Sequence, residues 1–568
     1  MDYQRIFIIL GLAVTAYLLI LAWNEDYGHK PAAVEPFQSA PSDQVATNDL
    51  PGVPGINSNS SGINGTEMDG TDIIPRVENA TAVTTAMQNE AVQQRTIHVK
   101  TDVLDLQIDL QGGDVVRGAL PRFPVTIDQP DVAFLLLDPQ NSYSAQSGLI
   151  GRNGTDTAAG RPIFQAASNS YEMVNEETLV VDLTLPSKDG ITITKRFTFS
   201  RGDYLIQVDY LVENGSSQIW QAAMFAQLKR DGEDPFASET QGMGMQPYVG
   251  GATFSDDGPY TKLEFDDVAD DGYKAQIEGG YMALVQHYFV SSWVPDGEGT
   301  YAYQARKLKD RNIFLYGFTG PIRQIEPGTS GQLSAQLYIG PKDQYRLEEI
   351  SPGLNLVVDY GFLWWLALPL FHLLTFIHDL LGNWGLSIIV LTIIVKSLLY
   401  PLSAASFRSM AKMRKLQPEM ARLKDRYGDD KQQFSQAMME LYKKEGANPL
   451  GGCLPILLQM PVFLALYWTL MESVELRHAP FILWIDDLSA MDPYFVLPIL
   501  MGISMFVTQM LQPEPPDPVQ AKVFKFMPIM FTFFFLWFPS GLVLYWFINN
   551  LLSIMQQWYV TRQLEKAS

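Results

Sequence analysis

A single lysine lies inside one of the most apolar stretches of the chain. Residues 384–402 read WGLSIIVLTIIVKSLLYPL and contain Lys396. As a helix, about 19 such residues cross the core of a bilayer. A lysine near mid-membrane costs roughly 2.5–3.5 kcal/mol on insertion scales, so it usually faces a partner, a protein interior or a water-filled cavity. Thr392 lies one turn earlier on the same face and extends the polar stripe. The alternative is that Lys396 snorkels to the nearer headgroups, because Leu402 is only six residues away.

Two glutamines are further polar groups within apolar stretches. Gln459 and Gln509 each lie in a segment that is otherwise long and apolar. Such groups either line a hydrated groove or make hydrogen bonds between helices, and the sequence leaves both interpretations open.

The sequence contains no pattern typical of catalysis or metal binding. Cys453 is the only cysteine, which excludes an intrachain disulfide and a cysteine metal cluster. The six histidines are scattered without metal-ligand spacing. Residues 96–345 hold no nucleophile elbow, phosphate loop or metal motif. We therefore expect neither an enzyme nor a cofactor nor a metal site.

Charge divides the chain into two unlike parts. The formal net charge is −22, yet residues 356–568 hold 16 basic and 16 acidic side chains, and Arg5 cancels Asp2. The whole excess therefore belongs to residues 24–355, with 23 basic and 45 acidic side chains. An acidic soluble part argues against nucleic acid or anionic lipid as its partner.

The first segments indicate a membrane anchor and a tether. Residues 1–23 contain an apolar run that is long for a signal peptide and lacks a small-residue cleavage site, which favours an uncleaved anchor with a cytoplasmic amino end. Residues 24–95 are rich in Pro, Gly, Ser, Asn, Thr and Ala, which predicts a disordered linker.

Residues 96–345 alternate in the manner of β-strands. In Ile191–Ser200 the apolar side chains share one face, with Lys195 as the exception, and Tyr204–Val212 alternates equally clearly. Ile313–Phe318 and Leu333–Ile339 look similar, and turn pairs separate the segments. Many short strands without intervening helices predict a large β-sandwich domain outside the cytoplasm.

The next two segments are expected at the membrane surface and in the cytoplasm. Residues 346–382 contain the aromatic stretch Leu354–Leu381. This stretch is either a spanning helix or, as we prefer, an amphipathic helix in the outer interface, because Asp379 does not suit a lipid core.

Residues 403–448 carry ten basic side chains against six acidic ones, which places them in the cytoplasm. Their apolar residues recur every three or four positions, which predicts a helical hairpin. This methionine-rich stripe either packs between the two helices or binds substrate; it comprises Met410, Met413, Leu416, Met420, Leu423 and Tyr427.

The hydrophobic stretches predict an α-helical membrane protein with six transmembrane helices. Five lie in a core over residues 383–568, and the amino-terminal anchor is the sixth. The expected core spans are 384–402, 450–470, 494–511, 524–538 and 542–560. This count leaves both termini in the cytoplasm and the β-sandwich domain on the other side of the membrane.

Several long strings in the membrane part resemble the YidC family of bacterial membrane protein insertases. They are NWGLSIIVLTIIVKSLLYPL, MAKMRKLQP, NPLGGCLPILLQMPVFLALY, VELRHAPFILWIDDLSAMDPY and FFFLWFPSGLVLYW. The resemblance covers residues 354 to about 565 almost continuously. The anchor, linker and large β domain that precede it resemble the Gram-negative form, whose exterior domain is a β-supersandwich.

The resemblance implies an insertase and chaperone for integral inner-membrane proteins, acting alone or with the Sec translocon. In this family five core helices enclose a polar groove that is open to cytoplasm and lipid and closed on the outside. A positive residue in the groove, commonly Arg, attracts acidic parts of the incoming chain, and the matching position here is Lys396. Lysine keeps the charge but lacks the planar fork of arginine, which favours diffuse attraction over a fixed carboxylate pair.

Other family positions carry over singly. Thr392 and Trp546 match family positions that are important for function. Phe463, Met501 and Phe534 match apolar positions along which a substrate helix slides, although on the residues alone they would be ordinary lipid-facing or packing residues. We also expect Gln459, Gln509 and Tyr545 in the groove beside Lys396. The implied partners are nascent integral membrane proteins, the Sec translocon and the lipid bilayer. The hairpin is a candidate site for the ribosome and targeting factors.

Two other functions remain as alternatives. A secondary transporter could bind an anion at Lys396, but such proteins often show internal repeats and none is visible here. A purely structural anchor for the β domain would leave the buried lysine and the hairpin without a role.

Overall fold

The computed structural model describes residues 95–233, 247–255, 258–296, 299–308, 311–427, 430–445, 454–512 and 518–567. The anchor expected over 1–23 and nearly all of the linker expected over 24–95 lie outside these residues. The described chain forms two compact units, a β-rich unit that ends at Val358 and a helical unit that begins at Asp359. Each unit is described by itself below.

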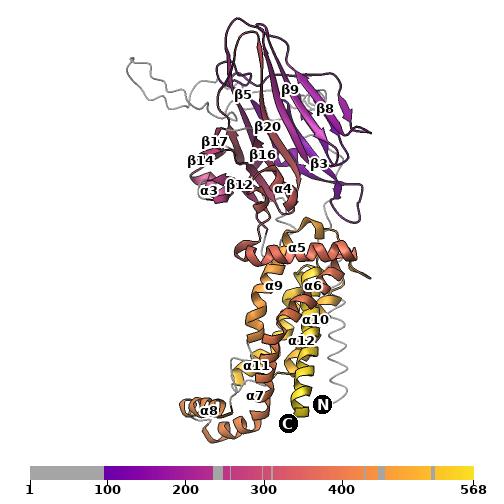
Figure 1. Ribbon diagram of the computed structural model, residues 1–568, viewed down its shortest axis with the longest axis vertical. Helices are drawn as coiled ribbons and strands as arrows, with labels where there is room; N and C mark the ends of the chain where they lie inside the picture. Colours follow the sequence, from indigo (N-terminus) through magenta and orange to yellow (C-terminus); the bar gives the residue numbers. More distant parts are fainter. Residues whose placement is uncertain are drawn as a thin grey trace, which may run out of the picture. The chain divides into compact units, whose positions relative to one another are not determined.

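Two large sheets form the β-rich unit (Figure 1). Among the described strands, every neighbouring pair is antiparallel except β1 with β7, which is parallel. The 11-stranded sheet runs β14 (Tyr273–Glu278), β17 (Thr300–Lys307), β18 (Ile313–Thr319), β11 (Trp220–Asp231), β5 (Ser144–Ile150), β3 (Asp114–Pro124), β2 (Asp105–Asp109), β1 (Thr96–Lys100) and β7 (Ser170–Glu172), with β4 (Ala133–Leu137) beside β3 and β19 (Arg323–Ile325) beside β11. The 9-stranded sheet runs β13 (Gly258–Leu263), β12 (Gly250–Ser255), β15 (Met282–Gln286), β16 (Phe289–Pro295), β20 (Thr329–Pro341), β10 (Leu205–Asn214), β9 (Ile191–Ser200), β8 (Thr178–Thr184) and β6 (Gln165–Ala166). Short helices are η2 (Pro139–Asn141), α3 (Phe265–Asp270), α4 (Gln344–Ile350) and η3 (Leu354–Val357).

The four strands expected from alternation are confirmed. Strand β9 has the expected bounds, and the other three lie within one to four residues of them in β10, β18 and β20. The sheets pack face to face: Trp293 of β16 is 1% exposed, and its indole nitrogen donates to the carbonyl oxygen of Gln227 in β11 at 3.2 Å. Burying a large apolar side chain of this kind stabilises by roughly 1.5–3 kcal/mol.

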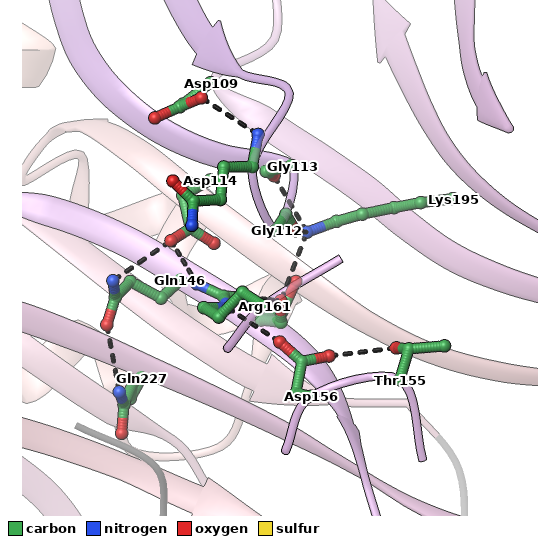
Figure 2. Close-up of polar contacts among 12 residues, drawn as sticks. Asp109, Gly112, Gly113, Asp114, Gln146, Thr155, Asp156, Arg161, Lys195 and Gln227 are labelled. Atoms are coloured by element: carbon green, nitrogen blue, oxygen red, sulfur yellow. Dashed lines mark hydrogen bonds and ion pairs between the residues drawn. The ribbon is translucent and has the colours of Figure 1, made fainter. Parts of the chain in front are cut away.

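Lys195 lies in the space between the sheets, on the apolar face of β9 where the sequence pattern places it. Its ammonium donates to the carbonyl oxygens of Gly112 at 3.0 Å and Gly113 at 2.8 Å, in the turn between β2 and β3 of the other sheet (Figure 2). Both glycines have positive φ, 78° and 67°, which suits glycine. Burial lowers the pKa of Lys195 to about 7.

Arg161 forms the centre of the same buried cluster. Its guanidinium donates to Asp156 at 2.7 Å and to Asp114, and Gln146 donates to the same Asp114 oxygen at 3.0 Å (Figure 2). Burial raises the pKa of Asp114, against the attraction of Arg161. A buried charge pair of this kind specifies one arrangement of the chain more than it adds stability, whereas removal of one partner is strongly destabilising.

The boundary expected at residue 346 is wrong. Residues 346–358 do not begin the interfacial helix but complete the β-rich unit. Leu347, Leu354 and Val357 are fully buried in the core that contains Tyr281. Arg346 pairs with an Asp203 carboxylate at 2.7 Å. These contacts hold the segment to the sheet, and the apolar spacing that resembled a continuing amphipathic helix is that of a short packed helix and a 3-10 turn.

The helical unit contains the remaining elements. They are η4 (Gly361–Leu363), α5 (Trp364–Leu381), α6 (Trp384–Leu398), α7 (Tyr400–Tyr427), α8 (Lys431–Glu445), α9 (Leu454–Glu472), η6 (Val474–Leu476), α10 (Val496–Met510), α11 (Pro518–Phe534), η7 (Phe535–Trp537) and α12 (Ser540–Ala567). Figure 1 shows α5 lying crosswise to α6, α9, α10 and α12.

Few of the described helices are long and apolar enough to cross a membrane. By length and composition, Gly361–Leu381 could cross a membrane, and α6 with α7 would count as a second span only if taken together across a bend of 67°. The six spans expected from the sequence therefore stay a prediction. The bend also divides the expected span 384–402, since α6 ends at Leu398 and α7 begins at Tyr400.

The methionine-rich stripe packs inside the helical unit. Leu416 and Met420 of α7 are buried against Met438 of α8, which closes the hairpin. Met410 packs instead with Phe407 of α7 and with α12. For Leu416 and Met420 the structure favours the packing interpretation over a substrate-binding surface.

Candidate functional site

Capping residues at one end of the helical unit hold the helices that surround the site. The Asn383 side chain accepts from the Leu386 amide at 3.0 Å and begins α6. The Asp492 carboxylate is buried and accepts from the Leu497 amide at 2.6 Å in the first turn of α10. The Ser540 amide donates to the Ala490 carbonyl oxygen at 2.7 Å at the start of α12. These bonds fix where three helices begin, and hence which of their side chains meet.

A cavity of about 540 Å³ lies between α7, α9, α10, α11 and α12. None of the described side chains that line it is charged. They are Phe407, Met410, Gln459, Met460, Phe463, Leu464, Tyr467, Met505, Thr508, Gln509, Gln512, Phe524, Met527, Phe531, Phe534, Phe535, Phe538, Tyr545, Trp546, Asn549, Asn550, Ser553 and Gln557.

Amides and hydroxyls gather toward one end of the cavity. The Asn549 amide of α12 donates to Gln459 Oε1 of α9 at 3.2 Å, and the Gln557 amide donates to the Leu511 carbonyl oxygen at 3.0 Å. The Gln509 amide of α10 donates to the Phe524 carbonyl oxygen of α11. The sequence left open whether Gln459 and Gln509 line a groove or make hydrogen bonds between helices. In the structure each of them does both.

Aromatic rings gather toward the other end. The rings of Phe463 and Trp546 meet edge to face at 4.5 Å, and Phe463 is stacked with Tyr545 at 6.4 Å. Phe534 and Phe538 are 4.7 Å apart between centroids. The cavity surface is therefore mostly apolar, with its amides nearer one end and most of its aromatic rings nearer the other.

Lys396 lies beside this cavity and not in its wall. It is 3% exposed, and none of the described residues forms a hydrogen bond or ion pair with it. It lines a narrow niche with Thr392, whose hydroxyl donates to the Ile388 carbonyl oxygen at 2.6 Å. The niche has no free space of the size of a water molecule. Gln459, Tyr545 and Asn549 line both the niche and the cavity, so these three side chains separate the lysine from the larger space.

The structure brings together most of the residues expected at the site. The cavity wall contains the expected residues Gln459, Gln509, Tyr545, Trp546, Phe463 and Phe534. Met501 lies elsewhere: it is completely buried in α10 and lines neither space, while Met505, one turn later, lines the cavity.

Sequence reasoning did not identify six polar residues of the cavity. Thr508 and Gln512 lie in and just after α10, and the other four, Asn549, Asn550, Ser553 and Gln557, lie in α12. The signal was present in α12, because positions 545, 549, 553 and 557 recur every four residues within an expected span and carry a phenol, an amide, a hydroxyl and an amide. Polar residues on one face of a spanning helix indicate a cavity or a helix contact.

No metal centre accompanies the cavity in the described part of the chain. Within those ranges, no group of three or more His, Cys, Asp or Glu side chains could hold a metal ion.

Comparison with known families identifies two matching regions. A family described as 60Kd inner membrane protein matches residues 376–567, and one described as YidC periplasmic domain matches residues 96–373. Three proteins named membrane protein insertase YidC each match 100% of this chain over 99% of their own length. They come from Ectopseudomonas mendocina strain ymp at 50% identity, Pseudomonas putida strain GB-1 at 51% and Pseudomonas syringae pv. syringae strain B728a at 52%.

Solved structures give more distant matches. A crystal structure of an active YidC insertase with its first transmembrane domain resolved is 20% identical and covers 84% of this chain and 98% of its own, with a TM-score of 0.39. A galactose mutarotase related enzyme from Lactobacillus acidophilus is 11% identical and covers 43% of this chain and 97% of its own, with a TM-score of 0.30.

Proposed function

Because the chain belongs to the YidC family, we propose that it is a membrane protein insertase of the bacterial inner membrane and not an enzyme. The observation that carries this proposal is similarity along the whole chain, at 50–52% identity to three insertases. As an insertase and chaperone it would take nascent integral membrane proteins as clients, alone or with the Sec translocon.

The uncharged cavity supports a mechanism of insertion by partitioning. A hydrophilic client segment that crossed alone would lose its water over the whole apolar core. Amides and hydroxyls at one end of the cavity can replace part of that hydration, and aromatic rings at the other end suit an apolar span. The span would then leave sideways into lipid, where burial of its apolar area is favourable. We assign Phe463 and Phe534 to the apolar path on their place in the wall. Met501, being buried, would act there only after a rearrangement of α10.

Lys396 would supply the single positive charge of the site. Its side chain is buried beside the cavity, and only a thin layer that includes Gln459 and Asn549 separates the two spaces. A cation in this position attracts the acidic part of a client through a medium of lower dielectric than water. Thr392 would help to keep the niche polar.

We propose six membrane spans, with both termini in the cytoplasm and the β-rich unit in the periplasm. The basic hairpin of α7 and α8 supports this orientation. The crosswise course of α5 supports an interfacial position for it, because a helix that crosses a spanning bundle lies near the membrane plane (Figure 1). The rings of Phe362 in η4 and of Trp364 and Trp365 at the start of α5 are 58–71% exposed, which suits the headgroup region. The hairpin would then meet the ribosome and targeting factors.

Reconstitution of the purified chain tests this function. Vesicles that contain only this protein should insert a single-span client, seen as protection of its far tail from added protease. Protein-free vesicles and vesicles with heat-denatured protein are the controls. Equal protection in all three would refute the proposal, and flux of a small anion without client insertion would favour a transporter.

A further inference from the structure

The cavity-facing side of α12 carries a regular series of neutral polar groups. Asn549, Ser553 and Gln557 follow one another at intervals of four residues and all line the cavity. At helical rise, four residues span about 6 Å along the axis. This polar face of α12, defined by these three residues, therefore carries a polar group about every 6 Å. The Asn549 amide already donates to Gln459, and the Ser553 hydroxyl donates to the Asn549 carbonyl oxygen at 2.7 Å.

Part of this hydrogen-bonding capacity is unused among the described residues. Gln557 is 5% exposed and its amide nitrogen is bonded to Leu511, but its Oε1 has no partner. Eleven residues earlier on the same helix, about 16 Å along its axis, the indole nitrogen of Trp546 is also buried without a partner. Two side chains of the cavity wall on the same helix thus carry a buried acceptor and a buried donor without a partner among the described residues, and a ligand that reached these atoms would satisfy them.

The chemistry of these groups matches that of a peptide backbone. Amides and hydroxyls both donate and accept, as peptide groups do, and the described residues of the cavity wall carry no charge that would select a particular side chain. An extended chain repeats the same side every two residues, or about 6.6–6.8 Å, close to the interval on α12. A helical client would use its own peptide groups internally and leave these side chains unused.

We propose that the polar face of α12 binds the backbone of an extended, non-helical client segment during its passage. This inference rests on the proposed insertase function. It specifies the backbone conformation in which the hydrophilic part of a client is bound. Recognition through the backbone explains how one neutral site accepts tails of different sequence. The aromatic end of the cavity would receive the helical span that follows.

Cysteine crosslinking along a client tests the conformation of the bound segment. The variant Ser553→Cys is made with Cys453→Ser, which removes the native cysteine. It is reconstituted as the full chain and given ribosome-bound clients, each with one cysteine at one of eight consecutive tail positions. An added oxidant then joins the two thiols where their Cβ atoms come within about 4.5 Å.

Disulfide yield should alternate along the client, high at every second position, because side chains of an extended segment point alternately toward and away from α12. Met555→Cys in the same background is the control, because Met555 is 64% exposed and does not line the cavity. A repeat of three to four positions, or uniform yield, would overturn the inference while normal insertion leaves the insertase function standing. Loss of insertion in the Cys453→Ser protein itself would count against both.

A second experiment separates backbone binding from a structural role of Gln557. Gln557→Leu should lower the rate of insertion of an ordinary client about fivefold, the scale of one hydrogen bond. A client whose tail has ester links in place of alternate peptide links lacks N–H groups to donate to Gln557 Oε1. Its insertion should be slower in the unsubstituted protein and unchanged by Gln557→Leu. An equal fall for both clients would show that Gln557 acts only by packing, against the inference; Met555→Leu is the matched control.

Discussion

Removal of the charge at Lys396 should abolish the preference of the insertase for acidic clients. Lys396→Met keeps a long unbranched side chain in the niche and removes only the ammonium. One layer of side chains, including Gln459 and Asn549, lies between the niche and the cavity. At roughly 8 Å and an effective dielectric constant of about 20, the attraction for one carboxylate is on the order of 2 kcal/mol, or about thirtyfold in a rate or partition constant.

The assay compares two clients that differ only in whether the exterior tail carries acidic or neutral residues. Initial insertion rates are measured in reconstituted vesicles, and the ratio between the clients is the readout, so that a general packing defect cancels. The ratio should fall about thirtyfold in Lys396→Met and be retained in Lys396→Arg. Ile394→Met is the matched control, since Ile394 lies on the same helix and is 41% exposed. An unchanged ratio in Lys396→Met at normal protein levels would show that the lysine does not act through its charge.

Three further predictions concern other parts of the chain. Deletion of most of 96–340 should leave insertion of a small client largely intact in cells depleted of the native protein, because no catalytic motif lies there; lost insertion at normal levels of the shortened protein would refute this. Hydrogen exchange over 403–448 should be faster than in α9 or α12, since its charged helices project from the bundle, and equally deep protection would show a rigid element instead. The β-rich unit should gain about 2 kcal/mol of unfolding free energy between pH 7 and pH 9, measured by urea-dependent proteolysis, because Lys195 has a folded pKa of about 7 and an unfolded pKa near 10.5. In that window the unfolded chain binds the extra proton, so stability rises with pH, and Lys195→Met should remove the slope.

The β-sheets could be predicted in part from the sequence because alternation is a local signal. Apolar residues at every second position of β9 predicted which face of the strand is buried. Lys195 falls on that face and is 1% exposed in the structure. The pattern could not show what a lysine would bond to there. Its partners at Gly112 and Gly113 lie more than 80 residues away and in the other sheet. Only the packing of the two sheets brings them together.

Candidate site residues in the helical unit could be proposed singly, but their grouping could not. Gln459 and Asn549 are 90 residues apart and meet through the packing of α9 on α12. The sequence gives no crossing geometry for two apolar helices, and a rotation of one helix by a single residue changes which side chains face the cavity. Met501 shows the effect, because it is buried while Met505 on the same helix lines the cavity.

The sequence also could not separate the lysine from the cavity. The apolar stretch placed Lys396 at membrane depth, with one polar stripe toward Thr392. The two side chains do share a niche, yet its wall toward the cavity comes from α9 and α12. Whether a buried charge lies in a space or beside it depends on those neighbours, which are distant in the sequence.

Photocrosslinking from adjacent residues of α11 tests most directly whether clients pass through the cavity. A photoreactive amino acid is placed at Phe534, which lines the cavity, or at Phe533, which is 56% exposed and does not. Both variants are given a ribosome-bound client with a single apolar span, and Phe463 serves as a second cavity position on α9. The proposed function predicts strong crosslinks from 534 and 463 to the client span and weak ones from 533. Crosslinks from 533 that equal or exceed those from 534, at normal insertion, would contradict passage through the cavity.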